Sequence, residues 1–259
     1  MAFTTITVEK RGPVDWLTFN RPESLNALSP TMAGEIADYF ASLIDNTRVR
    51  VVVMRGAGRA FCAGLDIKAQ LDGSDKSDGI SRLPEIVRDI KRCPQPVIAL
   101  VHGAACGGGF AFALAADIRI AGASMKMNDA FVTLGVSGCE LGLSYHLPRM
   151  VGASVARELM YTGKFIHAER AERVGLVSMV VPDTELEAAG EAMAADMLKV
   201  APLALRKTKE GFNRLCDAGD FEHVVEMEGE IQRECMRGPD FNEGLRAFAE
   251  KRAPQFSGD

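Results

Sequence analysis

Three consecutive glycines, Gly107 to Gly109, lie in the middle of the apolar run "VHGAACGGGFAFALAAD", which covers residues 101–117. The run is typical of a strand, a turn and then a helix. Glycine permits positive φ and close backbone approach, and a turn that enters a helix leaves amide N–H groups without partners in that helix. The sequence therefore predicts that another segment or a ligand lies directly against the main chain at this turn.

Composition and charge restrict the class of partner. The chain has 259 residues, 47% hydrophobic and 25% charged, which suits one large domain or a domain with an appended piece. The formal net charge is -5 and no block of lysine or arginine occurs, so we expect neither a nucleic-acid nor a membrane partner. An anionic ligand would need local basic residues, and the candidates are Arg55, Arg59, Lys68, Lys251 and Arg252.

Two patterns that the sequence lacks indicate the cellular compartment and the metal content. The start "MAFTTITVEK" lacks the basic and apolar segments of a secretory signal, and the six cysteines show no CxxC or Cys/His spacing. We therefore expect reduced thiols, a cytoplasmic protein and no metal site. The apolar run 97–116 is long enough for a membrane helix, but His102 and four glycines interrupt it, which favours a buried strand and helix.

The first part of the chain alternates strands and helices. Strands are predicted at 4–9 and 14–19, joined by the turn "RGP", and at "RVVVMRG", "PVIALVHG", "DIRIAG" and "LVSMVV". A helix is predicted to begin after Ser29 as cap and Pro30, and another at 83–93. The face predicted for the first helix consists of Met32, Ile36, Tyr39, Phe40, Leu43 and Ile44. Stacked ββα or βαβ units that share one core are therefore expected.

Beyond Asp183 the pattern becomes helical. Helices are predicted at 185–199, from 203 to roughly 236 and at 240–250, with Pro202 and Gly238 as breaks. The polar segment 72–80, "DGSDKSDGI", predicts a mobile surface loop.

A second glycine-bearing turn, "GRAFCAGLD" at 58–66, also follows a strand and precedes a helical stretch. Two such turns can present two amides to one anion, either a phosphate or the oxyanion of a reacting carbonyl group. The alternative is close packing of a helix on a strand, and the dinucleotide-binding fingerprint G-x-G-x-x-G is not matched.

Together with "FNRPESLNAL", these two turns resemble the enoyl-CoA hydratase/isomerase family, also called the crotonase family, over roughly residues 5–256. The resemblance implies an α/β fold, a crotonase-like spiral of repeated ββα units over 1–198, followed by a helical trimerisation region over 199–259. It also implies a homotrimer or a dimer of trimers. The substrate would be a coenzyme A thioester, with no permanently bound cofactor.

The resemblance also implies roles for particular residues. The backbone N–H groups of Leu65 and Gly108 would hold the thioester oxygen and stabilise an enolate. Contacts to coenzyme A would come from Leu25, Ala27, Ala63, Asp66, Ile67 and Lys68. Phe248 and Lys251, in "AFAEKRAPQF", would contact coenzyme A, often that of a neighbouring subunit; the alternative for Lys251 is a solvated lysine at a helix end.

The sequence departs from the family's hydratases at the two glutamates that transfer protons. The first falls at Ala111 and the second at or beside Phe131, and neither side chain can transfer a proton. Glu140, in "GVSGCELGLSYHLPRMVG", falls where dienoyl-CoA isomerases of the family carry a catalytic aspartate. One carboxylate can move a proton between two carbons, so the pattern favours isomerisation over hydration.

Other interpretations stay open at this point. Glu140 can equally be a glutamate in the first turn of a helix, stabilised by the helix dipole. Asn128 and Asp129 could replace it, although a surface-loop role is favoured for them, and Tyr145 and His146 could line the pocket or be structural. A thiol of Cys62 or Cys106 could attack an acyl group, although small core residues are the favoured interpretation.

Two further functions remain as alternatives. One is hydrolysis or decarboxylation of an acyl-CoA, in which the oxyanion hole supplies most of the catalysis. The other is a catalytically silent oligomer that binds coenzyme A. Since Ala111 and Phe131 replace glutamates, we expect a preference for apolar acyl groups.

Overall fold

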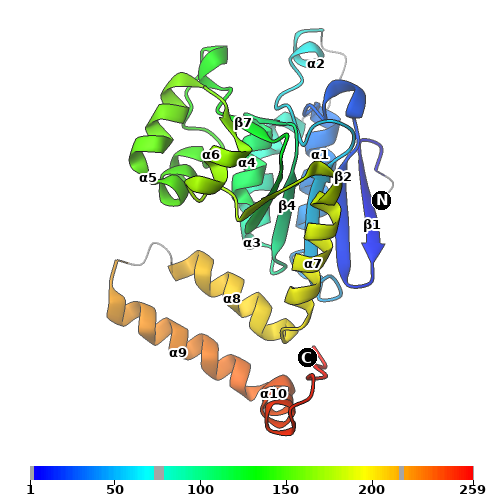
Figure 1. Ribbon diagram of the computed structural model, residues 1–259, viewed down its shortest axis with the longest axis vertical. Helices are drawn as coiled ribbons and strands as arrows, with labels where there is room; N and C mark the ends of the chain where they lie inside the picture. The colour runs from blue at the N-terminus through cyan, green and yellow to red at the C-terminus, as the bar shows by residue number, and fades with distance from the viewer. Residues whose placement is uncertain (1–2, 73–78, 216–218, 259) are drawn as a thin grey trace.

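The computed structural model describes residues 3–72, 79–215 and 219–258, and its core is a twisted six-stranded sheet in the order β1-β2-β3-β4-β6-β9 (Figure 1). β1 pairs with β2 in an antiparallel hairpin, and the remaining neighbours are parallel. The strands are Ile6–Arg11 (β1), Val14–Phe19 (β2), Val51–Gly56 (β3), Val97–Val101 (β4), Ile118–Gly122 (β6) and Met179–Val181 (β9). The predicted strand at 4–9 thus runs two residues further, because Gly12, with φ of +60°, makes the turn.

A second, three-stranded sheet follows the carboxyl ends of β4 and β6. It consists of β5 (Ala104–Cys106), β7 (Lys126–Asn128) and β8 (Ile166–His167). β5 and β7 are parallel, and Cys106 lies opposite Asn128. This small sheet carries the chain from the core to the glycine turn.

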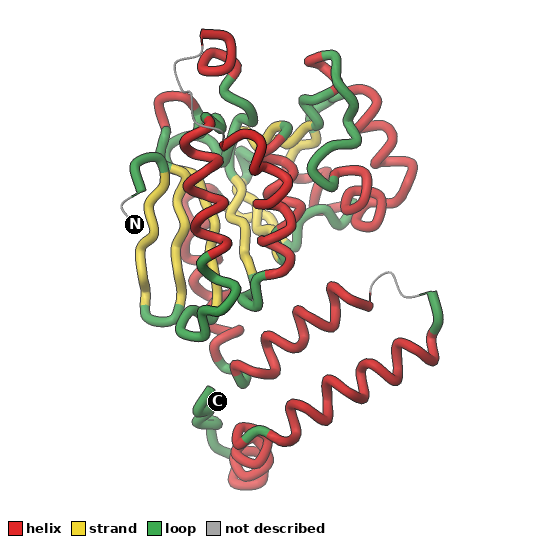
Figure 2. Tube along the Cα trace, turned by 180° about the vertical axis from the view of Figure 1, so that it is seen from behind, coloured by secondary structure: helices red, strands yellow, loops and turns green. Residues whose placement is uncertain are grey.

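Helices cover both faces of the large sheet, as Figures 1 and 2 show. Val52 and Met54 of β3 point into the core under α1, α3 and α4, whereas Val51 and Val53 point into the smaller core under α7. These helices are Pro30–Ala41 (α1), Leu83–Arg92 (α3), Gly108–Ala115 (α4) and Leu186–Leu198 (α7). The continuous valine run therefore forms a strand buried on both faces, as predicted.

α1 begins where the sequence indicates and ends earlier than its apolar spacing suggests. The Ser29 hydroxyl accepts a hydrogen bond from the Met32 N–H (3.2 Å), and Pro30 is the first helical residue. The helix ends at Ala41, so Ile44 leaves the buried face and is 40% exposed. The prediction that Ile44 shares this face was wrong.

The remaining described elements of this part of the chain are three helices and several short 3₁₀ turns. α5 (Leu143–Thr162) and α6 (Ala168–Arg173) lie between β7 and β9, and α2 (Ile67–Asp72) follows the first glycine turn. Short 3₁₀ turns occur at Pro22–Ser24, Gly79–Arg82, Val132–Leu134 and Asp183–Glu185. The loop expected at 72–80 falls mainly on residues 73–78, which lie outside the described residues.

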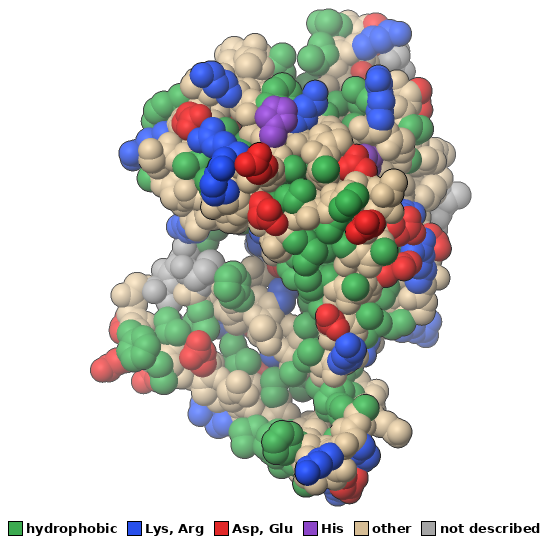
Figure 3. All heavy atoms as spheres, in the orientation of Figure 1, with side chains coloured by type: hydrophobic (Ala, Val, Ile, Leu, Met, Phe, Trp, Pro, Cys, Tyr) green, Lys and Arg blue, Asp and Glu red, His purple; other side chains and the backbone are tan. Residues whose placement is uncertain are grey.

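Three C-terminal helices extend beyond the core: α8 (Pro202–Leu215), α9 (Phe221–Arg237) and α10 (Pro239–Glu250) (Figure 1). The single helix predicted from 203 to about 236 was wrong. α8 ends at Leu215 and α9 begins at Phe221, where the Asp220 carboxylate accepts the Glu222 N–H (3.0 Å) as a cap. Large apolar side chains are exposed on these helices (Figure 3): Phe212, Phe221, Val225, Met236, Phe241, Leu245 and Phe248.

Lys209 attaches α8 to the core. Its Nζ lies 2.8 Å from the Asp117 carboxylate and donates to the carbonyl oxygens of Ile90 and Gln95, each at 2.8 Å. Only 5% of the Lys209 side chain is exposed. The C-terminal region is therefore anchored by a buried charge, not only by apolar contacts.

Replacing Lys209 by alanine is expected to lower the free energy of unfolding by about 3 kcal/mol, because Asp117 and two buried carbonyl groups lose their donor. Lys199→Ala is the matched control, since the Lys199–Asp196 ion pair (2.7 Å) is exposed. Urea unfolding at fixed protein concentration measures both. Equal stability of the two variants would contradict this role for Lys209.

Within the described ranges, no helix is long and apolar enough to cross a membrane. The apolar run 97–116 forms β4, β5 and α4.

Candidate active site

The two glycine-bearing turns lie directly against each other. Cys62 and β5 exchange backbone hydrogen bonds: the Cys62 N–H donates to the Ala104 oxygen, and the Cys106 N–H donates to the Cys62 oxygen, both at 3.0 Å. A Cβ atom on Gly64, whose φ is +91°, would lie 2.7 Å from the Cys106 carbonyl oxygen. The peptides that lead to Leu65 and to Gly108 are therefore in contact.

The three consecutive glycines serve different purposes. Gly107 has φ of +50° and ψ of -112°, a conformation that only glycine adopts readily, and its N–H donates to the Asn128 oxygen (3.1 Å). Gly108 begins α4, so its N–H has no acceptor within the helix. A Cβ atom on Gly109 would overlap the Cys62 carbonyl oxygen. Close packing thus explains Gly109, while Gly107 and Gly108 form the turn.

The backbone N–H of Leu65 points away from the neighbouring segment around Leu28. Leu28 donates to the Gly64 oxygen (2.7 Å) and accepts from the Asp66 N–H (3.1 Å), which makes Leu28 and Leu65 a parallel bridge pair. In such a pair the N–H of Leu65 points away from Leu28. The turn can therefore present this amide to a ligand.

The surroundings of the glycine turn are apolar. A Cβ atom on Gly108 would lie 2.7 Å from Leu28 Cδ1 and 3.9 Å from Leu141 Cδ1, and one on Gly107 would lie 3.8 Å from the Phe131 ring. Ala111, buried in α4, donates its N–H to the Gly107 oxygen (2.9 Å). An oxyanion held here would have few competing polar groups around it, which strengthens each hydrogen bond.

The loop "NRPESLNAL" is held by Asn26, which the sequence analysis did not single out. Asn26 is fully buried, with φ of 56°, and its Nδ2 donates to the oxygens of Ala57 (2.9 Å) and Ala60 (2.8 Å). Its Oδ1 accepts the Arg21 N–H (2.9 Å). The signal was available in the residue type, because asparagine adopts the left-handed conformation more readily than most residues.

An ion pair connects this loop to the first glycine turn. The Arg21 guanidinium lies 2.8 Å from the Asp66 carboxylate and also donates to the Ala27 oxygen. Burial would raise the pKa of Asp66, but the Ala69 N–H and Arg21 hold it below its ordinary value. Six of the eight residues predicted to contact coenzyme A are thereby brought to one region: Leu25, Ala27, Ala63, Asp66, Ile67 and Lys68.

The other two predicted contacts lie elsewhere in the same chain. Phe248, on α10, is 87% exposed, and Lys251 ends that helix with φ of 55°. Figure 1 places α10 at the opposite end of the molecule from α2. One chain alone therefore does not bring these two residues to the predicted site.

Glu140 is exposed and precedes α5, which begins at Leu143. The interpretation of Glu140 as a residue in the first helical turn was therefore wrong. The next residue, Leu141, has φ of 47°, is 8% exposed and packs beside Gly108. A leucine with positive φ is uncommon, and here it turns the chain so that Leu141 enters the site.

Asn128 and Asp129 are buried, so a surface-loop role for them was wrong. The Asn128 side chain donates to the Gly163 oxygen (3.0 Å), and Asp129 is fully buried. Tyr145 and His146 are half-buried in the first turn of α5. They line a cavity of about 1070 Å³ between α3, α5 and α8.

The thiols near the two turns are poor nucleophiles. Cys62 and Cys106 are buried, and burial raises the pKa of Cys62 to about 12 and that of Cys106 to about 11. The Nε2 atom of His102, four residues before Cys106, is 2.8 Å from the Gly58 oxygen. Both cysteines are core residues, as the favoured interpretation had them.

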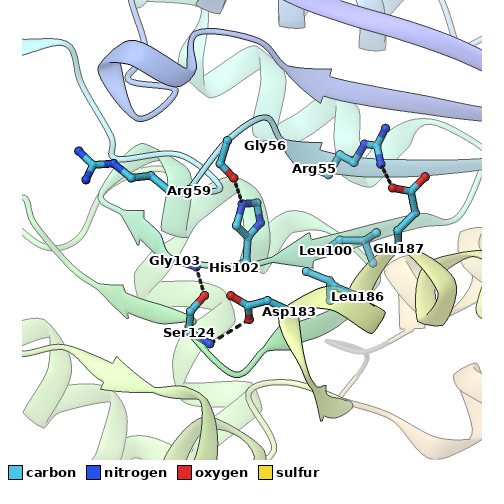
Figure 4. A pocket seen from close by; sticks show the side chains of 11 residues that line it. Arg55, Gly56, Arg59, Leu100, His102, Gly103, Ser124, Asp183, Leu186 and Glu187 are labelled. Atoms are coloured by element: carbon cyan, nitrogen blue, oxygen red, sulfur yellow. Dashed lines mark hydrogen bonds and ion pairs between the residues drawn. The ribbon is translucent and has the colours of Figure 1, made fainter.

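A cavity of about 440 Å³ lies on the α7 side of these turns (Figure 4). Arg55 is paired there with Glu187 (2.7 Å), and Asp183 accepts the Ser124 N–H (3.0 Å). Figure 4 shows the Arg59 side chain pointing away from Asp183. Arg252 is likewise paired, with Glu243 (2.6 Å), so Arg55 and Arg252 are weaker candidates for an anionic ligand than the sequence suggested.

Comparisons with known proteins agree with the fold. Residues 9–259 match the family model for enoyl-CoA hydratase/isomerase. A protein of Mycobacterium bovis named "Probable enoyl-CoA hydratase" is 38% identical and spans 96% of this chain and 91% of its own length. A crotonyl-CoA hydratase of Syntrophomonas wolfei is 33% identical, with 99% of each chain covered.

The crystal structure of an enoyl-CoA hydratase from Bacillus anthracis superposes with a TM-score of 0.92 at 32% identity, covering 99% of this chain and 100% of that one. The chain belongs to the enoyl-CoA hydratase/isomerase family and has the crotonase-like α/β fold with C-terminal helices. It is an enzyme family that acts on acyl-CoA thioesters.

Proposed function

We propose that this enzyme stabilises a thioester enolate between the N–H groups of Leu65 and Gly108 and acts as an enoyl-CoA isomerase. The observation that carries the proposal is the contact between the two glycine turns, which gives two backbone donors in apolar surroundings. The thioester oxygen gains negative charge when a proton leaves C2 of the acyl group, and the two amides stabilise that charge as it forms.

Glu140 is the proposed proton carrier. Its carboxylate takes the proton from C2 of a 3-enoyl-CoA, and the electrons move into the dienolate. The same group then returns a proton to C4, which gives the 2-enoyl-CoA. The assignment is supported by the next residue, Leu141, which packs beside Gly108. Ala111 and Phe131 also lie beside the turn, and neither side chain can accept or donate a proton.

Hydration is the second candidate, because the relatives from Mycobacterium bovis and Syntrophomonas wolfei are named hydratases. The two reactions are distinguished by incubation with a 3-enoyl-CoA and, in parallel, with crotonyl-CoA, followed by chromatography that resolves the isomers and by mass spectrometry. Isomerisation conserves mass, whereas hydration adds one water. Fast conversion of the 3-enoyl-CoA with little hydration supports the proposal, and fast hydration of crotonyl-CoA contradicts it. Release of free coenzyme A or of CO₂ would instead indicate hydrolysis or decarboxylation.

The apolar surroundings also predict the acyl preference. A medium-chain acyl-CoA is expected to bind at least about 10-fold more tightly than succinyl-CoA, because the succinyl carboxylate would lose water without gaining a partner near Leu28, Phe131 and Leu141. Calorimetric titration with both ligands measures this. Comparable affinities would show that a cation reaches the acyl group.

Oligomerisation would complete the coenzyme A site. We assign residues 1–198 to the spiral core and 199–259 to an oligomerisation region, which fits the exposed apolar side chains of α8 to α10. In a homotrimer or a dimer of trimers, Phe248 and Lys251 would reach the coenzyme A of a neighbouring subunit. Light scattering is therefore expected to give three or six times the 27.9 kDa chain mass. A monomer at working concentration would contradict this assignment.

A further inference from the structure

Asp129, the residue that follows β7, is a buried acid that the proposed proton transfer does not use. It is fully buried, and its Oδ1 accepts the Phe131 N–H (3.2 Å). Its Oδ2 is also buried and has no hydrogen-bond partner among the described residues. A buried carboxyl oxygen without a partner is costly, so its presence here calls for an explanation.

The Asp129 carboxyl lies between the end of α5 and the segment that leads to Glu140. A Cβ atom on Gly138 would overlap Asp129 Oδ2, and the same position is 3.2 Å from the Met160 carbonyl oxygen. On the other side, a Cβ atom on Gly163 would lie 3.1 Å from the Asp129 carbonyl oxygen. Glycine at positions 138 and 163 therefore leaves room for Asp129.

Asp129 lies in the chain between a contact with the glycine turn and the segment that contains Glu140. Asn128, directly before Asp129, pairs with Cys106 across the small sheet and accepts the Gly107 N–H (3.1 Å). Directly after Asp129 begins the segment 130–140, which contains Phe131 and Glu140. A shift of this acid would therefore move the proton carrier relative to the oxyanion turn.

We propose that Asp129 is a positioning residue whose carboxyl holds segment 131–138 against the end of β7 and thereby fixes Glu140 relative to Gly108. The part that concerns Glu140 rests on the function proposed above. The part that concerns the segment itself is independent of any activity.

Burial and the Phe131 N–H act in opposite directions on the protonation of Asp129. The Phe131 amide and Gly138 lie against its carboxyl, and the causes that shift its pKa are burial and the Phe131 N–H, with no charged side chain of the described residues among them. Burial raises the pKa of Asp129 from 3.8 to about 6, although the Phe131 N–H opposes the rise. The proton is thus bound more tightly in the folded state. The stabilisation from it is complete below pH 3.8 and is lost as pH rises through about 6.

The test compares Asp129→Ala, which removes the acceptor of the Phe131 N–H, with Asp129→Asn, which keeps the shape and cannot ionise. Asp45→Asn, at an exposed aspartate, is the control. We expect hydrogen exchange of peptides within 130–140 to rise at least about 10-fold in Asp129→Ala, with exchange in the large sheet unchanged, and to return to the wild-type rate in Asp129→Asn.

Turnover adds a second readout. Because small misplacements of reacting groups are costly, kcat should fall roughly 10- to 100-fold in Asp129→Ala with little change in KM, and should recover in Asp129→Asn.

The midpoint of thermal unfolding should fall between pH 4.5 and 7.5 more steeply in wild type than in Asp129→Asn. Gly138→Ala, which would displace the carboxyl without changing any charge, should repeat the exchange result.

A uniform rise in hydrogen exchange across the whole chain of Asp129→Ala would overturn the proposal. So would failure of Asp129→Asn to restore the wild-type exchange rate of segment 130–140. If hydrogen exchange of the segment rises in Asp129→Ala while Glu140→Gln turns over normally, the function proposed for Glu140 fails. The positioning of segment 131–138 by Asp129 then stands. If Glu140→Gln is inactive and hydrogen exchange of the segment is unchanged in Asp129→Ala, only the positioning role of Asp129 fails.

Discussion

Glu140→Gln is expected to lower the rate of 3-enoyl-CoA isomerisation by at least about 100-fold, because general acid–base catalysis by a positioned carboxylate contributes 10²- to 10⁴-fold. Glutamine keeps the size of the side chain and cannot accept the C2 proton. Binding of acyl-CoA should change little, because the contacts predicted for coenzyme A come from other segments. Single-turnover kinetics gives the rate of the chemical step, and calorimetry gives the affinity.

Glu169→Gln is the matched control, since the Glu169 side chain is 90% exposed on α6, and it should keep the wild-type rate. Turnover that survives Glu140→Gln would remove Glu140 from the mechanism. Hydrolysis or decarboxylation, which need fewer proton-transfer groups, would then become the better explanation of any activity.

Gly108→Pro is expected to lower kcat by roughly 100- to 1000-fold, which is the usual cost of losing one oxyanion-hole donor. Proline removes the N–H and is compatible with the first position of a helix, where Gly108 lies in α4. Gly108→Ala is the matched control. Both variants place a Cβ atom 2.7 Å from Leu28 Cδ1, but alanine keeps the N–H.

The difference between these two variants separates the contact of the Cβ atom with Leu28 from the changes that proline makes at the nitrogen, where the N–H is lost and the ring Cδ takes its place. Circular dichroism should first show that both are folded. If kcat falls equally in Gly108→Pro and Gly108→Ala, contact with Leu28 explains the loss and the N–H of Gly108 is not the oxyanion donor.

Local sequence patterns predicted the features that depend on short-range physics. The valine run of β3 indicated burial on both faces, and Ser29 with Pro30 located the start of α1. The three consecutive glycines indicated a close approach of the backbone, although only the structure separates the packing role of Gly109 from the turn at Gly107. In these places the residue type itself restricts the conformation.

Features that depend on distant segments were missed or misassigned. The burial of Asp129 arises from the end of α5 and from Gly138, which are distant in sequence, whereas the polar pair Asn128 and Asp129 suggested a surface loop. Asn26 organises its loop through carbonyl groups more than 30 residues away. The end of α8 at Leu215 and the start of α9 at Phe221 were also not predicted.

Solvent deuterium exchange tests the formation of the enolate most directly. The purified enzyme is incubated with a 3-enoyl-CoA in deuterated water, and the mass of the acyl group is followed over time in substrate and product. An enolate held by Leu65 and Gly108 predicts deuterium at C2 or C4 of the acyl chain at a rate far above the enzyme-free control. Measurable binding of the acyl-CoA with no deuterium in either compound would contradict enolate chemistry and leave a coenzyme A-binding oligomer as the better description.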